Sequence, residues 1–212
     1  AVQRGLSVVV LERNDKPGKK IRISGGGRCN FTNLTVDHTN FLSANPDFSR
    51  SALSRYTPQD FIALVESHGI AWHDKPLGQS SGDRPSQQIR DLLVHQVADK
   101  RAEGGGIGRL MTNVEVQRIS NNGEFLVSTS RGEFRARNLV VATGGLSIPS
   151  LGASDLGYRI AQQYDIPIIQ PEPALVPLTF GPAWQDTFGA LSGVSIPVSA
   201  RGDGPAFREN ML

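Results

Sequence analysis

A glycine-rich loop near the start of the chain holds the residues best suited to bind a ligand. In order, it reads Ser24, Gly25, Gly26, Gly27, Arg28, Cys29 and Asn30. Three consecutive glycines cost backbone entropy, but they let the backbone approach a flat ring or a phosphate and offer it N–H donors. A flexible linker is the alternative interpretation, although linkers rarely carry Arg-Cys-Asn directly after the glycines. No Gly-Lys-Ser or Gly-Lys-Thr follows, which excludes a Walker A loop.

An acidic residue follows a short apolar run before this loop. Val8–Leu11 is β-branched and wholly apolar, which predicts a parallel strand buried on both faces, and Glu12 ends it. In a dinucleotide-binding unit, an acid at this place accepts hydrogen bonds from ribose hydroxyls. An ordinary surface acid is the alternative. The glycine fingerprint of such a unit would lie just before Ala1, which fits our interpretation of the chain as an internal piece of a longer protein. A complete domain with a processed N-terminus is the alternative.

A second apolar run has the same form. Leu139–Ala142 predicts another buried parallel strand, and Thr143, Gly144 and Gly145 follow it directly. Small residues at the carboxyl end of a strand let a cofactor approach the edge where α/β folds bind ligands. A tight turn is the alternative interpretation.

Cys29 is the only cysteine, so no intrachain disulfide can form. Arg28 and the loop N–H groups would lower its pKa if it were reactive, but a small packing residue is the favoured interpretation. The four histidines have no ligand spacing, and we predict no metal site.

The remaining pattern predicts how these residues are positioned. A helix begins at Thr57, where Pro58 and a capping box with Asp60 are expected, and a second helix spans Ser86–Ala102. Strands are predicted at Leu110–Ile119 and Phe125–Ser130, joined by a turn at 121–123, and a helix at Asp155–Tyr164. Prolines crowd the chain from Pro171 onward, where we place a domain boundary before a strand at Val194–Ala200.

Composition bounds the function class. The chain has 212 residues, 38% of them hydrophobic, with 22 basic and 20 acidic side chains and a formal charge of +2. No apolar run approaches the ~20 residues of a membrane span. An excess of two charges is not a phosphate-binding stripe, so we predict no nucleic-acid partner, no membrane partner and a cytoplasmic protein.

Two longer segments resemble a known family. The run from Gly18 to Asn33 and the run from Val141 to Pro149, with Ala174–Leu178 and Leu191–Gly193 after them, resemble the HI0933-like (YhiN/BaiN-type) flavoproteins. The resemblance covers nearly the whole chain in order. One departure is the polar stretch Ser80–Pro85, where relatives carry a more apolar block.

This resemblance implies an α/β fold. Residues 1–170 would form an incomplete FAD/NAD(P)-binding Rossmann-like domain, with a helical insertion at about 45–105, and residues 171–212 would begin a mainly β domain. It also implies the cofactor-binding roles. Glu12 would bind the adenosine ribose, Val114 would meet the adenine through its backbone, and Thr143 to Gly145 would pass close to the cofactor. The pyrophosphate and flavin would be lined by Lys19, Lys20, Ser24, Gly25, Gly26, Gly27, Arg28, Cys29 and Asn30.

The expected function is that of an FAD-dependent oxidoreductase that takes electrons from NAD(P)H and acts on a small organic substrate. No catalytic acid or base stands out. An FAD-binding protein without catalysis is the alternative, because Rossmann-type folds host many functions. A nucleic-acid-associated flavoprotein is a third possibility, which the near-neutral charge disfavours. The sequence leaves the oligomeric state open.

Overall fold

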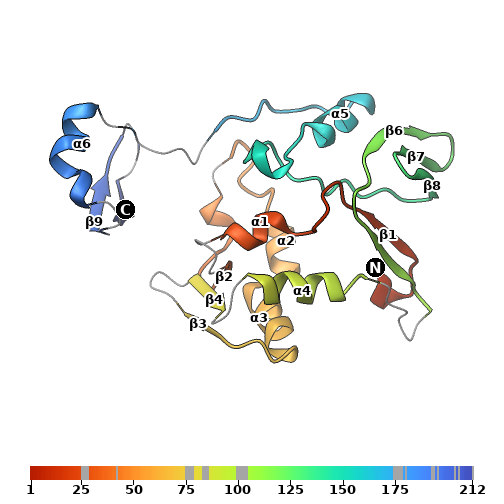
Figure 1. The fold of residues 1–212 in the computed structure, drawn as a ribbon, viewed down its shortest axis with the longest axis horizontal. Coiled ribbons are helices and arrows are strands. Elements are labelled where there is room, and N and C mark those ends of the chain that lie inside the picture. Colours follow the sequence, from red (N-terminus) through yellow and green to blue (C-terminus); the bar gives the residue numbers. More distant parts are fainter. Residues whose placement is uncertain are drawn as a thin grey trace. The chain divides into compact units, whose positions relative to one another are not determined.

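The computed structural model describes residues 1–24, 29–41, 43–74, 79–82, 86–98, 105–173, 179, 181–191, 194, 196–202, 204 and 206–211. The chain forms two compact units, Ala1–Ile168 and Ile169–Leu212, each with its own elements (Figure 1). Gly25, Gly26, Gly27 and Arg28, the centre of the predicted ligand loop, lie outside the described residues. No helix in the described ranges has the length and apolar character that crossing a bilayer requires.

A parallel strand pair organises the first unit. Strand β1 (Val8–Leu11) pairs with β5 (Gly108–Met111), with Val8 opposite Gly108 and Leu11 opposite Met111. The predicted parallel strand is therefore confirmed. The prediction that both its faces are buried is wrong, because Val9 is 45% and Val10 37% exposed. Among the described residues this sheet has two strands, so β1 has a hydrogen-bonded neighbour on one side only.

The segment between β1 and β5 is mixed rather than purely helical. It contains the strands β2 (Asn30–Asn33), β3 (Trp72–Asp74) and β4 (Gln79–Gly82), which form an antiparallel sheet in the order β2-β4-β3. Its helices are α1 (Lys19–Ile23), α2 (Arg50–Arg55), α3 (Pro58–Ser67) and α4 (Gln87–His95), with a short 3₁₀ turn at His38–Asn40. Its core is built from Cys29, Val65, Ile70, Ile89 and Leu92.

Local sequence signals position α3 well and α4 less well. Thr57 accepts a hydrogen bond from the Asp60 N–H, and the Asp60 carboxylate accepts one from the Thr57 N–H, which is the predicted capping box. The second predicted helix is too long, because α4 ends at His95 and turns follow it. Ser86 does not cap α4 with its side chain. Its hydroxyl instead donates to the Arg22 carbonyl at 2.8 Å, which ties α4 to α1.

A three-stranded antiparallel meander follows β5. Its strands are β6 (Val116–Asn121), β7 (Phe125–Thr129) and β8 (Gly132–Ala136), and helix α5 (Leu156–Gln163) contributes Ile160 to their core. The prediction of one strand at Leu110–Ile119 is wrong, because the extended structure is interrupted between β5 and β6. Asn113 adopts a left-handed conformation there, with φ 54°, which a continuous strand does not allow.

The second apolar run does not form a strand. Residues 137–145 have no regular structure, and Val140 and Val141 are 84% and 45% exposed. A strand needs a hydrogen-bonded neighbour, and in the described part of the chain β1 and β5 pair only with each other. The predicted buried strand at Leu139–Ala142 is therefore wrong for this structure.

The second unit is small. It contains α6 (Pro182–Phe188), a 3₁₀ turn at Gly189–Leu191, and the antiparallel pair β9 (Ile196–Ala200) and β10 (Phe207–Met211). The rings of Trp184 and Phe188 pack with centroids 4.8 Å apart. Its strand β9 lies within the predicted strand range of 194–200.

Candidate functional site

The candidate site lies at the carboxyl end of β1, where the chain leaves the strand pair. The Glu12 N–H donates to the Met111 carbonyl at 2.8 Å, and the Val114 N–H donates to the Glu12 carbonyl at 3.0 Å. The Asn113 N–H donates to the Asn14 carbonyl, also at 3.0 Å. The loop after β1 is therefore fixed to the loop after β5. Val114 itself is 1% exposed, so its side chain packs inside while its backbone holds Glu12.

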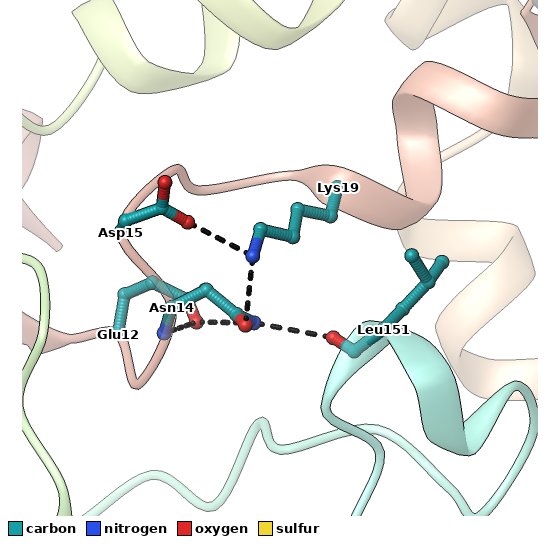
Figure 2. Close-up of polar contacts among 5 residues, drawn as sticks. All are labelled: Glu12, Asn14, Asp15, Lys19 and Leu151. Atoms are coloured by element: carbon teal, nitrogen blue, oxygen red, sulfur yellow. Dashed lines mark hydrogen bonds and ion pairs between the residues drawn. The ribbon is translucent and has the colours of Figure 1, made fainter.

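The Glu12 carboxylate is held in one orientation by Asn14. Its Oε1 accepts from the Asn14 N–H at 2.8 Å and from the Asn14 Nδ2 at 3.1 Å (Figure 2). The hydrogen bonds among the described residues leave its Oε2 without a donor. An oriented carboxylate with one oxygen available suits a ribose diol, which offers hydroxyl donors.

Asn14 joins three segments of the chain. Its Nδ2 also donates to the Leu151 carbonyl at 3.3 Å, and its Oδ1 accepts from the Lys19 Nζ at 3.2 Å (Figure 2). Lys19 in turn pairs with Asp15 at 2.9 Å. This hydrogen bond from Lys19 holds the pKa of the Asp15 carboxyl below its ordinary value. The loop after β1, helix α1 and the 3₁₀ turn Pro149–Leu151 thus meet at one asparagine.

A second contact brings α1 to the loop after the second apolar run. The Lys20 Nζ donates to the Ser147 hydroxyl. At the end of α1, the Ser24 hydroxyl donates to the Ile21 carbonyl at 2.8 Å. Lys19 and Lys20 therefore link the loop after β1 to residues 147–151.

Thr143, Gly144 and Gly145 lie beside α5 rather than beside Glu12. A methyl group placed on Gly157 of α5 would lie 2.8 Å from the Thr143 hydroxyl, so Thr143 packs closely against this helix. Gly144 is left-handed, with φ 72°. Among the residues that the structure describes, these exposed residues make no hydrogen bond to Glu12, and their role toward a cofactor stays a prediction.

Cys29 and Asn30 mark the far end of the predicted ligand loop. Cys29 is 2% exposed within the core of α3 and α4, a position that suits packing rather than thiol chemistry. Its N–H donates to the Ser24 carbonyl at 3.0 Å, which brings the two ends of the loop together. Asn30 is exposed at the start of β2.

Sequence reasoning missed the residues that join the site. The local pattern gives no role to Asn14 or Leu151, and Ser147 enters only within the run from Val141 to Pro149 that resembles the family. An asparagine two residues after a strand-terminal acid is a local signal, because such side chains bond to neighbouring groups. The contacts to Leu151 and Ser147 span 137 and 127 residues and carry no local signal.

The Glu12 carboxylate and the amines of Lys19 and Lys20 are the groups that fit a dinucleotide. An oriented carboxylate lies at the carboxyl end of a parallel strand, and two lysine amines lie beside it, which suits a ribose and a diphosphate. Among the described residues no group of three or more His, Cys, Asp or Glu side chains could hold a metal ion.

Comparison with known proteins gives the fold. A family model described as the HI0933-like protein Rossmann domain matches residues 1–199. The expected α/β Rossmann-like fold is thereby confirmed. A glycine oxidase structure from Geobacillus kaustophilus aligns with 77% of this chain over 53% of its own chain, with 14% identity and a TM-score of 0.44.

Three curated relatives are similar in sequence. Ribosomal RNA dihydrouridine synthase of Escherichia coli K12 is 44% identical over 213 residues, which cover 100% of this chain and 52% of the relative. The protein of the same name from Haemophilus influenzae Rd is 46% identical over 198 residues, 92% of this chain and 48% of the relative. The 3-dehydro-bile acid delta(4,6)-reductase of Clostridium scindens is 28% identical over 172 residues, which cover 81% of this chain and 41% of the relative. The chain spans about half the length of these relatives.

These relatives overturn one expectation. The prediction that nucleic acid is not a partner is wrong, because two relatives with 44% and 46% identity are named for an activity on ribosomal RNA. The prediction rested on the net charge of the whole chain, and a sum over 212 residues says nothing of where the charges lie.

Proposed function

This chain belongs to the HI0933-like family of Rossmann-domain proteins, and we propose that the protein it belongs to is an FAD-dependent reductase that converts uridine in ribosomal RNA to dihydrouridine. The observation that carries the proposal is the identity of 44% and 46% to two ribosomal RNA dihydrouridine synthases over 100% and 92% of the chain. RNA takes the place of the small organic substrate expected from the sequence. Because ribosomal RNA is the proposed substrate, we also propose that the protein acts in the cytoplasm.

The relatives' names share one type of chemistry. Dihydrouridine is uridine with its C5–C6 double bond saturated, and that bond is conjugated with the C4 carbonyl. A delta(4,6)-reductase of a 3-dehydro bile acid likewise acts on double bonds in a ketone. Saturating one such double bond takes up two electrons and two protons. We propose that NAD(P)H supplies the two electrons and one proton as a hydride, and that the second proton comes from water. FAD, when bound, supplies the hydride chemistry, while the protein binds and orients the reactants.

The chain's own residues support the cofactor part of this proposal. The Glu12 carboxylate, oriented through Asn14, is proposed to accept hydrogen bonds from the adenosine ribose. Lys19 and Lys20, which link this loop to residues 147–151, are proposed to neutralise the diphosphate. The Val114 N–H fixes the Glu12 backbone, and Val114 is proposed to meet the adenine through its backbone.

The proposal is tested with the protein made from its complete gene. We expect a flavin absorption spectrum that bleaches with anaerobic NADH or NADPH. We also expect dihydrouridine in unmodified ribosomal RNA after incubation, measured by nucleoside mass spectrometry. A flavin that bleaches without any dihydrouridine would refute the RNA substrate and favour a small unsaturated ketone. A flavin that no nicotinamide reduces would favour the non-catalytic alternative.

Glu12→Gln sharpens the test of the cofactor role. Glutamine keeps the size of the side chain, but it turns an acceptor-only group into one that also donates. We expect weaker FAD retention in this variant than in Glu133→Gln, which changes an exposed acid of the meander. Equal retention in the two variants would contradict the assignment of Glu12 to the ribose.

A further inference from the structure

Positive charge is concentrated at the start of the chain. Residues 1–30 contain seven basic and two acidic side chains, whereas the whole chain has 22 and 20. The rest of the chain therefore carries more acidic than basic groups. Such an asymmetry indicates an anionic partner for one region even where the total charge is near zero.

Four of these cations lie together on and just before α1. We call Lys16, Lys19, Lys20 and Arg22 the basic segment. Two of them are engaged at the candidate site, since Lys19 contacts Asp15 and Asn14 and Lys20 contacts Ser147.

Lys16 and Arg22 remain exposed. No ion pair among the described residues includes either side chain. They are therefore solvated cations, available to an anion at little cost in broken contacts.

The backbone that carries them is fixed in place. The Arg22 carbonyl accepts from the Ser86 hydroxyl of α4 at 2.8 Å, and Lys16 lies between Asp15 and the start of α1 in the loop that Asn14 anchors. Lys16 therefore directly follows Asp15 of the anchored loop, and Arg22 lies on the same helix as Lys19 and Lys20. An RNA substrate that approaches the cofactor site can therefore meet these cations without displacing a contact made by the described residues.

We propose that Lys16 and Arg22 bind phosphates of the RNA substrate next to the cofactor site. This inference rests on the proposed function, and it assigns the two unpaired cations to the substrate rather than to FAD. Contacts of this kind position the RNA without reading its sequence. Each phosphate contact to a single strand adds about 0.7 to the slope of log affinity against log salt concentration.

The test uses the FAD-loaded protein from the complete gene and a fluorescein-labelled 20-nucleotide oligouridylate. In Lys16→Ala/Arg22→Ala, the slope of log affinity against log salt concentration is expected to be smaller in magnitude by about 1.4 than in the wild type. If the wild-type and variant affinities become equal near 1 M salt, the variant binds RNA about 25-fold more weakly at 0.1 M salt. FAD content and bleaching by NADPH are measured on the same samples and are expected to stay at the wild-type level. The swap Lys16→Arg/Arg22→Lys, which keeps both charges, is expected to bind like the wild type.

Arg118→Ala/Arg131→Ala is the matched control. It removes the same charge from two exposed arginines of the meander region and is expected to keep the wild-type salt slope. The proposal is overturned if the control loses as much affinity as the test variant, or if the test variant binds RNA like the wild type. A loss of FAD with unchanged RNA affinity would likewise overturn it and assign the segment to the cofactor.

The outcome for the proposed function is read separately. A wild-type protein that binds RNA through Lys16 and Arg22 but forms no dihydrouridine in ribosomal RNA would refute the reaction and keep the surface. A wild-type protein that forms dihydrouridine with a salt slope independent of these cations would keep the reaction and refute the surface. A wild-type protein that does neither refutes both.

Discussion

Asn14→Ala should loosen the candidate site without unfolding the chain. The substitution removes three side-chain hydrogen bonds, to Glu12, Leu151 and Lys19, with lengths of 3.1, 3.3 and 3.2 Å. A net contribution of about 1 kcal/mol each gives about 3 kcal/mol as an upper bound. Because the side chain is half-buried and the bonds are long, we expect about 2 kcal/mol, or about 30-fold in the local opening equilibrium.

Amide hydrogen exchange measures this opening residue by residue. The Gly152 N–H, which bonds to the Pro149 carbonyl, should exchange about 30-fold faster in Asn14→Ala, while the Ile70 N–H at the end of α3 should keep its rate. Asn122→Ala is the control, since Asn122 is an exposed turn residue. A change of less than about threefold at Gly152 would refute the view that Asn14 holds these segments together.

Two further substitutions test the fold. Gly108→Ala would place a methyl group 2.1 Å from the Val97 carbonyl oxygen, so we expect the free energy of unfolding, measured with urea, to fall by about 3 kcal/mol. Gly189→Ala is the control, because a methyl group there meets open space and should leave the free energy of unfolding nearly unchanged. Equal urea midpoints for the two variants would contradict the close packing at Gly108. The hydrogen bonds from Thr57 lower the pKa of Asp60, so this carboxylate stabilises the fold above its unfolded pKa of about 4 and the effect is lost as pH falls through the folded pKa. The difference in Tm between wild type and Asp60→Asn should therefore shrink between pH 6 and pH 3, and a constant difference would show that charge plays no part in the cap.

The elements that sequence predicted correctly are those with local causes. The capping box of α3 depends on residues three apart, and β1 depends on a run of β-branched side chains. The errors have causes outside the local pattern. Leu139–Ala142 is as apolar as β1, yet strand formation depends on a partner, and the break at Asn113 follows from hydrogen bonds to the loop after β1.

The candidate site shows the same division. Glu12 could be proposed from its place after an apolar run, because the carboxyl end of a strand is where α/β folds bind ligands. Asn14 gained importance only from Leu151, 137 residues away, and no spacing rule connects them. The error about nucleic acid arose differently, since the local concentration of cations in residues 1–30 was visible in the sequence and was hidden by summing the charge over the whole chain.

The exposed run Leu139–Ala142 has a consequence for self-association. It is uncharged and β-branched at its centre, and Val140 is 84% exposed. Backbone groups in such a run can pair with the same run in another copy, which is how edge strands nucleate aggregates. Aggregation of this chain should therefore rise with its concentration. The substitution Val140→Lys would place a charge in the run and so oppose that pairing.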